Sequence, residues 1–402
     1  MAFAVNINRI IGEIDAATGG TAACTRPSYG AADAKTREYF LEVFGELGLD
    51  VHVDGAGNIR AAMKGKEPGL APVLVGSHID TVRNGGRFDG LLGVVCALEC
   101  LRIFKEQGHV PRRNVEIIIF AEEEGSNFGV TLLGSKLLTG KLSQAALKEL
   151  VNDAGESADA VIRDYDKLQP GDVYAMVELH IEQGPILADL KIPVGVVENI
   201  AGMETFRVTL TGTSGHAGTT AMANRKDPMV GAAEVILCMQ KAAEKADGGT
   251  AVATVGKLTA RPGATNVIAR EVEFFVDIRD TDEASIDGLA MSLAFFAETA
   301  AEKHGLVAEV SRISKSAAIK LDSDVIKTID QVATGLGINA KHMNSGAVHD
   351  AGMMADIAKV GMIFVPSIGG LSHCPEEDTR PSDIEIGANV LLETVKRLAE
   401  GV

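Results

Sequence analysis

The chain contains 402 residues, of which 46% are hydrophobic and 23% are charged, so its composition is that of a globular protein with two or three domains. Its 38 Lys and Arg residues are outnumbered by 55 Asp and Glu residues, which gives a formal net charge of −17. A surface this acidic repels phosphate backbones and anionic headgroups, which argues against nucleic-acid binding and against a membrane-surface role. An anionic small substrate remains possible where cations in a cleft overcome the overall field.

The sequence carries no signal for export or for a membrane. No apolar run approaches the roughly 18 residues that span a bilayer, and the first residues lack a basic segment followed by an apolar one. The five cysteines are scattered, and Cys96 and Cys100 lie four apart in an apolar helical pattern. That position favours reduced packing residues over a zinc or redox pair. We therefore expect a cytoplasmic protein.

Four segments of the first half alternate between strand-like and helix-like patterns. Residues 71–77, 115–121 and 173–179 are apolar runs typical of strands buried on both faces, and residues 89–108 place apolar side chains on one helical face. Strands that alternate with helices predict an α/β domain with a mostly parallel sheet and helices on both faces. Ligands of such sheets bind beyond the carboxyl ends of the strands.

The pattern changes near residue 203, where an α+β segment begins. The expected elements follow the order β-α-β-β-α-β of split-βαβ, ferredoxin-like domains. They are strands at 204–212, 250–258, 271–279 and 307–313 and helices at 227–245 and 283–304. A strand at 361–366 and a helix at 383–400 resume the first pattern. We predict that a domain of residues 203–314 is inserted into a larger domain made of residues 1–202 and 315–402.

The first chemical cluster is G-S-H-I-D-T-V-R-N-G-G-R-F-D-G, residues 76–90. It places His78 and Asp80 directly after a strand and Asp89 at the start of the next helix. Imidazole nitrogens and carboxylate oxygens at a strand end are ligands for zinc and similar ions, and Asp80 could instead orient His78. The alternative is that Asp89 caps its helix and His78 is a hydrogen-bonded core histidine.

The second cluster is A-E-E-E-G-S-N-F, residues 121–128, which again follows a buried strand. Three adjacent carboxylates repel one another unless cations neutralise them. A divalent metal would do so and would leave one carboxylate free to act as a general base. The alternative is a solvated acidic turn.

Two further clusters, E-L-H-I-E-Q-G-P at residues 178–185 and G-G-L-S-H-C-P-E-E-D-T at residues 369–379, each contain a histidine past a strand. A single histidine in such a position is more often structural than a ligand. Four strand-end clusters that share three histidines and many carboxylates are harder to ascribe to chance. Together they predict a metal site.

These motifs resemble, over nearly the whole chain, the amidase/hydantoinase/carbamoylase branch of the aminoacylase-like dinuclear zinc amidohydrolases. The branch includes N-carbamoyl-L-amino-acid hydrolases, allantoate amidohydrolases and β-ureidopropionases. The resemblance is carried by G-S-H-I-D-T-V-x-N-G-G-R-F-D-G, E-E-E-G-S-x-F, H-I-E-Q-G-P-x-L, G-H-A-G-T-T and G-G-x-S-H-x-P, which occur in the branch's order. It implies a zinc-peptidase-like catalytic domain and an inserted ferredoxin-like domain that serves as lid and dimerisation module.

The resemblance also implies a metal-site role for particular residues. Two divalent ions per subunit, zinc or exchangeable manganese, cobalt or nickel, would be bridged by Asp89. The other ligands would be His78 and His180 on one ion and Glu124 and His373 on the other. Glu123 matches the family's general base, and Asp80 matches the carboxylate that orients His78.

The resemblance assigns a substrate clamp as well. His216 in G-T-S-G-H-A-G-T-T matches the histidine that reaches the substrate carbonyl oxygen, usually from the partner subunit of a homodimer. Asn266 and Arg279 match residues that bind the substrate carboxylate, and an Arg fork suits that task. Gln183 and Gly370 match further substrate-binding positions. The alternatives are a loop histidine for His216, a turn former for Asn266 and a surface ion pair for Arg279.

Several positions depart from the family pattern. Asn127 stands where the family usually has Arg, and Val348 stands where it usually has Gly. The segment S-H-C-P-E-E-D-T lacks the commoner Asn and Tyr, and A-G-M-E-T-F lacks the aromatic residues often found there. No expected ligand is lost, but these positions lie near the expected pocket and leave the substrate open.

The leading hypothesis is a metal-dependent amidohydrolase that cleaves the carbamoyl C–N bond of an N-carbamoyl-L-amino acid. Allantoate hydrolysis is the nearest alternative, followed by hydrolysis of N-acyl amino acids or dipeptides. A hypothesis from another class is a non-catalytic metal-binding protein of the same fold. It would require loss of the base or of a ligand, and the sequence retains all of them.

Overall fold

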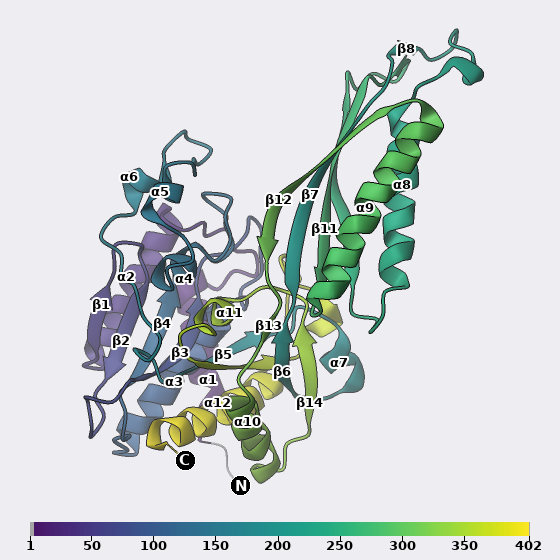
Figure 1. Ribbon diagram of the computed structural model, residues 1–402. Coiled ribbons are helices and arrows are strands. Elements are labelled where there is room, and N and C mark those ends of the chain that lie inside the picture. Colours follow the sequence, from purple (N-terminus) through teal and green to yellow (C-terminus); the bar gives the residue numbers. More distant parts are fainter. Residues whose placement is uncertain (1–3, 402) are drawn as a thin grey trace. The chain divides into compact units, whose positions relative to one another are not determined.

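The computed structural model describes residues 4–401, which form two compact units (Figure 1). The smaller unit is the stretch Asn199–Lys320, and the larger consists of the described residues on either side of it. The predicted insert, residues 203–314, lies within the smaller unit, whose bounds extend further because they also take in residues 199–200 and the short strand Ile319–Lys320 that pairs with them. Residues 1–3 and 402 of the predicted larger domain lie outside the described part.

The larger unit is built on a sheet whose centre is parallel and whose flanks are antiparallel. The strand order is β1-β2-β4-β3-β5-β15-β6-β13, with β14 paired to β6. The bounds are β1 Asp50–Val53, β2 Ile59–Met63, β3 Val73–His78, β4 Val115–Phe120, β5 Ala175–Ile181, β6 Val194–Ile200, β13 Ile319–Lys320, β14 Ala340–Ser345 and β15 Lys359–Val365. The prediction of a parallel sheet is confirmed for β4, β3, β5 and β15, whereas the antiparallel flanking strands were not predicted.

Helices cover both faces of this sheet, as expected for central strands that are buried on both faces. The helices are α1 Ile7–Thr18, α2 Ala31–Glu46, α3 Leu91–Glu106, α4 Leu133–Leu138, α5 Gln144–Leu147, α6 Ala158–Val161, α7 Ile186–Leu190, α10 Ser323–Gly335, α11 Asp350–Met354 and α12 Pro381–Glu400, with the 3-10 turn η2 at Ile368–Gly370. Val177 and Leu179 of β5 point into the core shared with α3 and α12. Glu178, between them, points to the other face and accepts the backbone N–H of Ala351 in α11.

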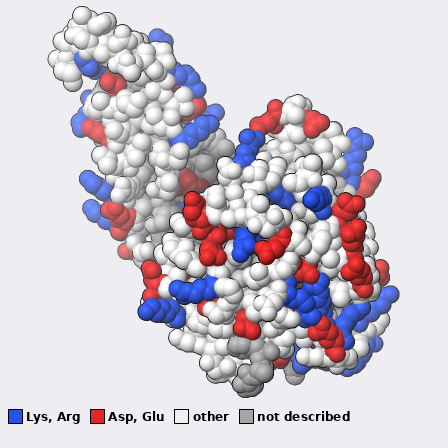
Figure 2. All heavy atoms as spheres, turned by 180° about the vertical axis from the view of Figure 1, so that it is seen from behind, with Lys and Arg blue, Asp and Glu red and all other residues white. Residues whose placement is uncertain are grey.

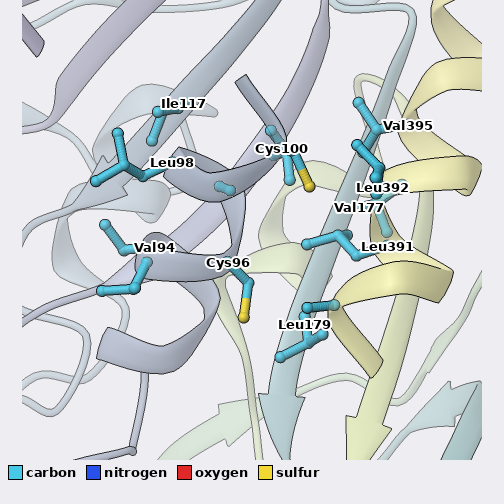
Figure 3. Packing of buried hydrophobic residues seen from close by; sticks show 14 of the residues in the cluster. Val94, Cys96, Leu98, Cys100, Ile117, Val177, Leu179, Leu391, Leu392 and Val395 are labelled. Atoms are coloured by element: carbon cyan, nitrogen blue, oxygen red, sulfur yellow. The ribbon is translucent and has the colours of Figure 1, made fainter. Parts of the chain in front are cut away.

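The two closely spaced cysteines of α3 are core residues. Cys96 and Cys100 are fully buried among aliphatic side chains that include Val177, Leu179 and Leu391 (Figure 3). Both are free thiols, as are the other three cysteines. Burial raises the pKa of the Cys100 thiol well above its usual value, which keeps it protonated and inert. The expectation of reduced packing residues agrees with this environment.

Truncation of a core residue of α3 tests this packing. Leu98 is fully buried in the same core, and Leu98→Ala should lower the free energy of unfolding by about 2–5 kcal/mol through lost transfer energy and a residual cavity. The matched control is Leu190→Ala in α7, because the Leu190 side chain is 52% exposed; its effect should stay within about 0.5 kcal/mol. Chemical denaturation measures both variants, and equal effects would contradict the described core.

The smaller unit has the predicted order of strands and helices. Its sheet has the order β12-β7-β11-β9, and a two-stranded sheet pairs β10 with β8. The bounds are β7 Gly202–Thr211, β8 Gly215–His216, η1 Met222–Asn224, α8 Pro228–Glu244, β9 Val252–Arg261, β10 Val267–Ile268, β11 Glu271–Asp280, α9 Glu283–His304 and β12 Val307–Ser316. Alternate residues of β7, such as Phe206 and Val208, pack under α8 and α9. This is the arrangement of a sheet with helices on one face.

The described surface mixes charges of both signs. Figure 2 shows one face, on which Lys and Arg lie among Asp and Glu rather than gathering in a single field. Among residues 4–401, no helix combines the length and the apolar character that crossing a bilayer requires.

Candidate metal centre and active site

The predicted metal ligands gather at the carboxyl ends of the central parallel strands. His78 is the last residue of β3, and His180 lies near the end of β5. Glu124 follows β4, and Asp89 precedes α3 on the connection from β3. His373 lies on the segment between η2 and α12, beyond β15. The carboxyl ends of parallel strands meet at one edge of a sheet, so these side chains lie close together, as the sequence predicts.

Asp89 is shared by two groups of donor atoms. Its Oδ1 lies 3.1 Å from Nε2 of His180, and its Oδ2 lies 3.0 Å from Nε2 of His373. One group joins Asp89 to His78 and His180, and the other joins it to Glu124 and His373; within each group the donor atoms lie within 4.8 Å of one another. The structure thus assembles the other four predicted ligands around the carboxylate of Asp89.

The two strand-borne histidines present the same ring nitrogen to the cluster. Nδ1 of His78 lies 3.1 Å from the carbonyl oxygen of Asp80, and Nδ1 of His180 lies 2.9 Å from that of Ile181. Each Nδ1–H donates to its carbonyl, so Nε2 faces the cluster with its lone pair. Histidines that ligate metals are usually held in this way, and the donors fit a divalent cation.

The carboxylates of the cluster outnumber the cations that could neutralise them. Burial, together with the neighbouring Asp89, raises the pKa of Glu124 to about 9. The Oε1 atom of Glu124 is buried and accepts no hydrogen bond from the described residues, and its ion-pair contact is with Nε2 of His373 at 3.4 Å. Such a group is costly to leave unpaired, and a divalent cation would satisfy it. The donor set, three imidazoles with carboxylates and no thiolate, suits zinc and other first-row divalent ions.

Asp89 favours the protonated forms of two histidines of the cluster. The hydrogen bond to Asp89 raises the pKa of His373 to about 9 against the opposing effect of burial. Burial likewise disfavours the charged form of His180, but the same carboxylate raises the pKa of His180 to about 9. A metal ion competes with these protons for the same nitrogens, so binding releases them.

Glu123 lies beside the cluster without belonging to either group of donors. Its Oε2 is 3.9 Å from Nε2 of His78, and its side chain is 9% exposed. Burial raises the pKa of Glu123 well above its usual value, and the adjacent Glu124 adds to the shift. A carboxylate with a high proton affinity at the edge of a cluster is suited to accept and return a proton.

Glu122, the remaining glutamate of the acidic run, has a structural role. Its Oε1 accepts the backbone N–H groups of Asn127 and Phe128, both at 2.7 Å. This carboxylate therefore closes the turn 122–128, and it is buried rather than solvated. The three neighbouring glutamates thus have three different surroundings, which the sequence pattern could not separate.

Asp80 differs from the expectation that its carboxylate orients His78. The carboxylate Oδ1 lies 3.7 Å from Nδ1 of His78, beyond hydrogen-bond distance, and the main-chain carbonyl of Asp80 takes that role instead. The two carboxylate oxygens accept the backbone N–H groups of Glu123 and Glu124 at 3.2 and 3.1 Å. Asp80 therefore positions the segment that carries the candidate base and one ligand.

Gln183 and Gly370 lie at the rim of the cluster. Nε2 of Gln183 donates to Oδ1 of Asp89 at 3.2 Å, while its Oε1 is buried without a donor. Gly370 has a φ of 68°, and a Cβ there would lie 2.8 Å from the backbone nitrogen of Pro185. Only glycine meets both demands, so Gly370 lets its chain segment approach the segment of Gln183.

Sequence reasoning missed three groups around the cluster, of which His349 and Asp350 are buried and Lys136 is half-buried. His349 packs edge-on against His180 with ring centroids 4.6 Å apart, and Lys136 donates to the carbonyl oxygen of Thr131. The side chain of Asp350 accepts a hydrogen bond from Ser135 at 2.5 Å. His349 and Asp350 directly follow Val348, and this His-Asp pair is the signal in the sequence that could have located them.

A third group of possible donors, Glu178, His180 and His349, is satisfied by protein contacts. Glu178 accepts from the Ser77 hydroxyl at 2.6 Å and from a backbone N–H. His349 shares a hydrogen bond with the hydroxyl of Ser345 at 2.9 Å. We therefore interpret this group as structural support for His180 rather than as a further metal site.

Three residues of the predicted substrate clamp belong to the smaller unit. His216 lies in β8 and Arg279 in β11, and the carbonyl of Asn266 accepts the backbone N–H of Ala217 at 3.0 Å. The Arg279 guanidinium is paired with Asp277 at 2.7 Å and is 32% exposed. The structure thus contains the ion pair that is the alternative role of Arg279.

His216 is oriented by its own loop. Its Nδ1 accepts the backbone N–H groups of Gly218 and Thr219 at 3.0 and 3.2 Å. The neutral ring therefore carries its proton on Nε2, and this N–H is the donor that the ring can offer to another group.

The fold and this donor set are those of a metallohydrolase, and the peptidase family M20/M25/M40 matches residues 74–397. The chain belongs to that family. It is 38% identical to an N-carbamoyl-L-amino-acid amidohydrolase of Paenarthrobacter aurescens over 93% of each chain. It is also 38% identical to a ureidoglycolate hydrolase of Arabidopsis thaliana, over 93% of this chain and 82% of that protein.

Two further similarities fall in the same branch. The chain is 33% identical to an allantoate amidohydrolase of Bacillus subtilis, over 88% of this chain and 87% of that one. A crystal structure of an amidase of the hydantoinase/carbamoylase family from Burkholderia multivorans superposes with a TM-score of 0.91 and 30% identity, over 98% of both chains. The predicted branch is thereby confirmed. The protein is an amidohydrolase that acts on carbon–nitrogen bonds other than peptide bonds.

Proposed function

We propose that the protein hydrolyses the carbamoyl C–N bond of an N-carbamoyl-L-amino acid with two divalent ions bound at the cluster. The observation that carries the proposal is the position of Asp89, whose two carboxylate oxygens face His180 and His373 separately. A carboxylate engaged on both oxygens is suited to bridge two cations. The fold alone would not distinguish this site from a single-ion one.

The donors divide naturally between the two ions. His78 and His180 would complete one site, and Glu124 and His373 the other, with Asp89 common to both. Zinc is the preferred ion for this set of nitrogen and oxygen donors, and manganese, cobalt or nickel could replace it. When bound, the ions would supply Lewis-acid polarisation of the scissile carbonyl and acidify the attacking water.

The protein's own groups would move the proton. Glu123 would take a proton from the water that attacks the carbamoyl carbon, and it would return the proton to the leaving amine nitrogen as the C–N bond breaks. The raised pKa of Glu123, due first to its burial, suits a group that must hold the proton between these steps. The products would be the amino acid and carbamate, which decomposes to carbon dioxide and ammonia.

The smaller unit would bind the remaining parts of the substrate. Arg279 and Asn266 would bind the carboxylate, and the Nε2–H of His216 would donate to the carbonyl oxygen where negative charge develops. The two backbone N–H groups on Nδ1 support this assignment of His216, because they leave its proton on Nε2. Gln183 and Gly370 would contact the ureido group.

Ureidoglycolate and allantoate are the alternative substrates. The ureidoglycolate hydrolase relative is as similar in identity as the N-carbamoyl-amino-acid relative, and the allantoate relative is close behind. All three substrates join a ureido group to a carbon next to a carboxylate, so a shared clamp would accept each. The departures at Asn127 and Val348 are candidates for the choice among them.

An ammonia-release assay on a panel separates these possibilities. The panel contains N-carbamoyl-L-amino acids, the matching D-enantiomers, ureidoglycolate, allantoate and N-acetyl amino acids, each with added Zn²⁺ or Mn²⁺. Release of the free amine is followed in parallel, because N-acetyl substrates give no ammonia. The proposal expects the highest kcat/KM for an N-carbamoyl-L-amino acid. Preference for another substrate would overturn the assignment, and no hydrolysis of any would favour a binding protein.

We further propose a homodimer in which His216 enters the active site of the partner subunit. The test mixes His216→Ala with Glu123→Gln under conditions of subunit exchange. Each mutant homodimer should be nearly inactive, whereas one of the two sites in a mixed dimer would carry neither lesion, so activity should partly return. Proven exchange without any recovery would mean that His216 serves its own subunit.

A further inference from the structure

A buried carboxylate outside the donor set connects the two segments that carry Asp89 and His373. Glu377 is 4% exposed. Its Oε1 accepts the backbone N–H groups of Phe88 and Asp89 at 2.9 and 3.1 Å. Its Oε2 accepts the hydroxyl of Ser372, the neighbour of His373, at 2.8 Å. One side chain therefore holds both segments at once.

His373 needs such a connection more than the other histidines of the cluster do. His78 and His180 lie in strands, and their side chains are 3% and 1% exposed. His373 lies outside any strand, its side chain is 48% exposed, and its backbone has a φ of 58°. Because a positive φ is unfavourable for a non-glycine residue, surrounding contacts must maintain that conformation.

Gly86 leaves the space that the side chain of Glu377 occupies. A Cβ on Gly86 would lie 2.1 Å from both the carboxyl carbon and Oε1 of Glu377. Gly86 is not among the residues with positive φ, so the requirement here is space rather than backbone conformation. The segment before Asp89 is therefore shaped to receive this carboxylate.

We propose that Glu377 is a positioning residue that fixes Asp89 relative to His373 and thereby sets the affinity of the group Asp89, Glu124 and His373 for its ion. The inference rests on the proposed two-ion function. Groups that hold metal ligands in place typically change metal affinity by about 10–100-fold when they are removed. The group of His78, Asp89 and His180 should change less, because two of its three donors are held by the sheet.

The test is a Zn²⁺ titration of the full-length protein after removal of metal with a chelator. Isothermal calorimetry should resolve two binding events in the wild type, and Glu124→Gln identifies the event that belongs to the second group. In Glu377→Ala the Zn²⁺ affinity of that same binding event should fall at least about tenfold, and the affinity of the other event should change little. The matched control, Glu376→Ala, alters an exposed neighbour and should bind like the wild type. Two events of wild-type affinity in Glu377→Ala would overturn the inference.

Two further variants separate position from charge and guard against misfolding. Glu377→Gln keeps an oxygen for the N–H of Asp89 and should retain most of the affinity. Gly86→Ala displaces the intact Glu377 side chain and should weaken the same event, while Gly86→Ala in the Glu377→Ala background should add little. Independent, additive effects of the two substitutions would count against the inference. Fewer than two binding events in the wild type would instead overturn the two-ion function.

Discussion

Glu123→Gln is expected to lower turnover at least ~100-fold while metal content and folding stay as in the wild type. The amide has nearly the same shape as the carboxylate, but it can no longer take up a proton. Glu123 lies outside both groups of donors, so its loss removes no ligand. Steady-state kinetics on the best substrate and elemental analysis of the same sample measure the two quantities.

The control for this variant is the same chemical change one residue away. Glu122→Gln keeps an oxygen that can accept the N–H groups of Asn127 and Phe128, so the turn should remain closed. Its turnover should stay within a fewfold of the wild type. A wild-type rate in Glu123→Gln would mean that another group moves the proton, and Asp350, which is buried nearby, would be the first to examine.

Asp89→Asn is expected to remove ions from both groups of donors. Its carboxylate faces His180 on one oxygen and His373 on the other, and a neutral amide cannot bridge two cations as a carboxylate does. Elemental analysis after gel filtration in metal-free buffer should find well under one ion per chain. Glu124→Gln, which belongs to one group, should keep the other ion. Equal metal content in the two variants would contradict the shared role of Asp89.

Local signals predicted many of the elements well. The helix predicted at residues 283–304 has those bounds because Asp282 caps its start and Gly305, with a φ of 62°, ends it. The central strands were recognisable as short apolar runs. The flanking strands β1 and β14 were missed because they are short and mostly exposed or half-buried, and they lack such a run.

The convergence of the candidate ligands was predictable from the sequence, whereas the contacts that support them were not. The strand-end rule located His78, His180 and Glu124 from the pattern of runs and polar clusters. Glu377 could not be found in this way, because it meets the N–H of Asp89 from 288 residues further along the chain. The role of the Asp80 carbonyl was likewise hidden, since a backbone contact leaves no mark on residue type.

Two ions at the Asp89 cluster are proposed to support hydrolysis of an N-carbamoyl-L-amino acid. The most direct measurement strips the wild-type protein with a chelator, adds Zn²⁺ back in steps and follows ammonia release from that substrate. Activity should be lost on stripping and should return to a plateau near two equivalents of Zn²⁺ per chain. A plateau at one equivalent, or activity that survives complete removal of metal, would contradict the two-ion proposal.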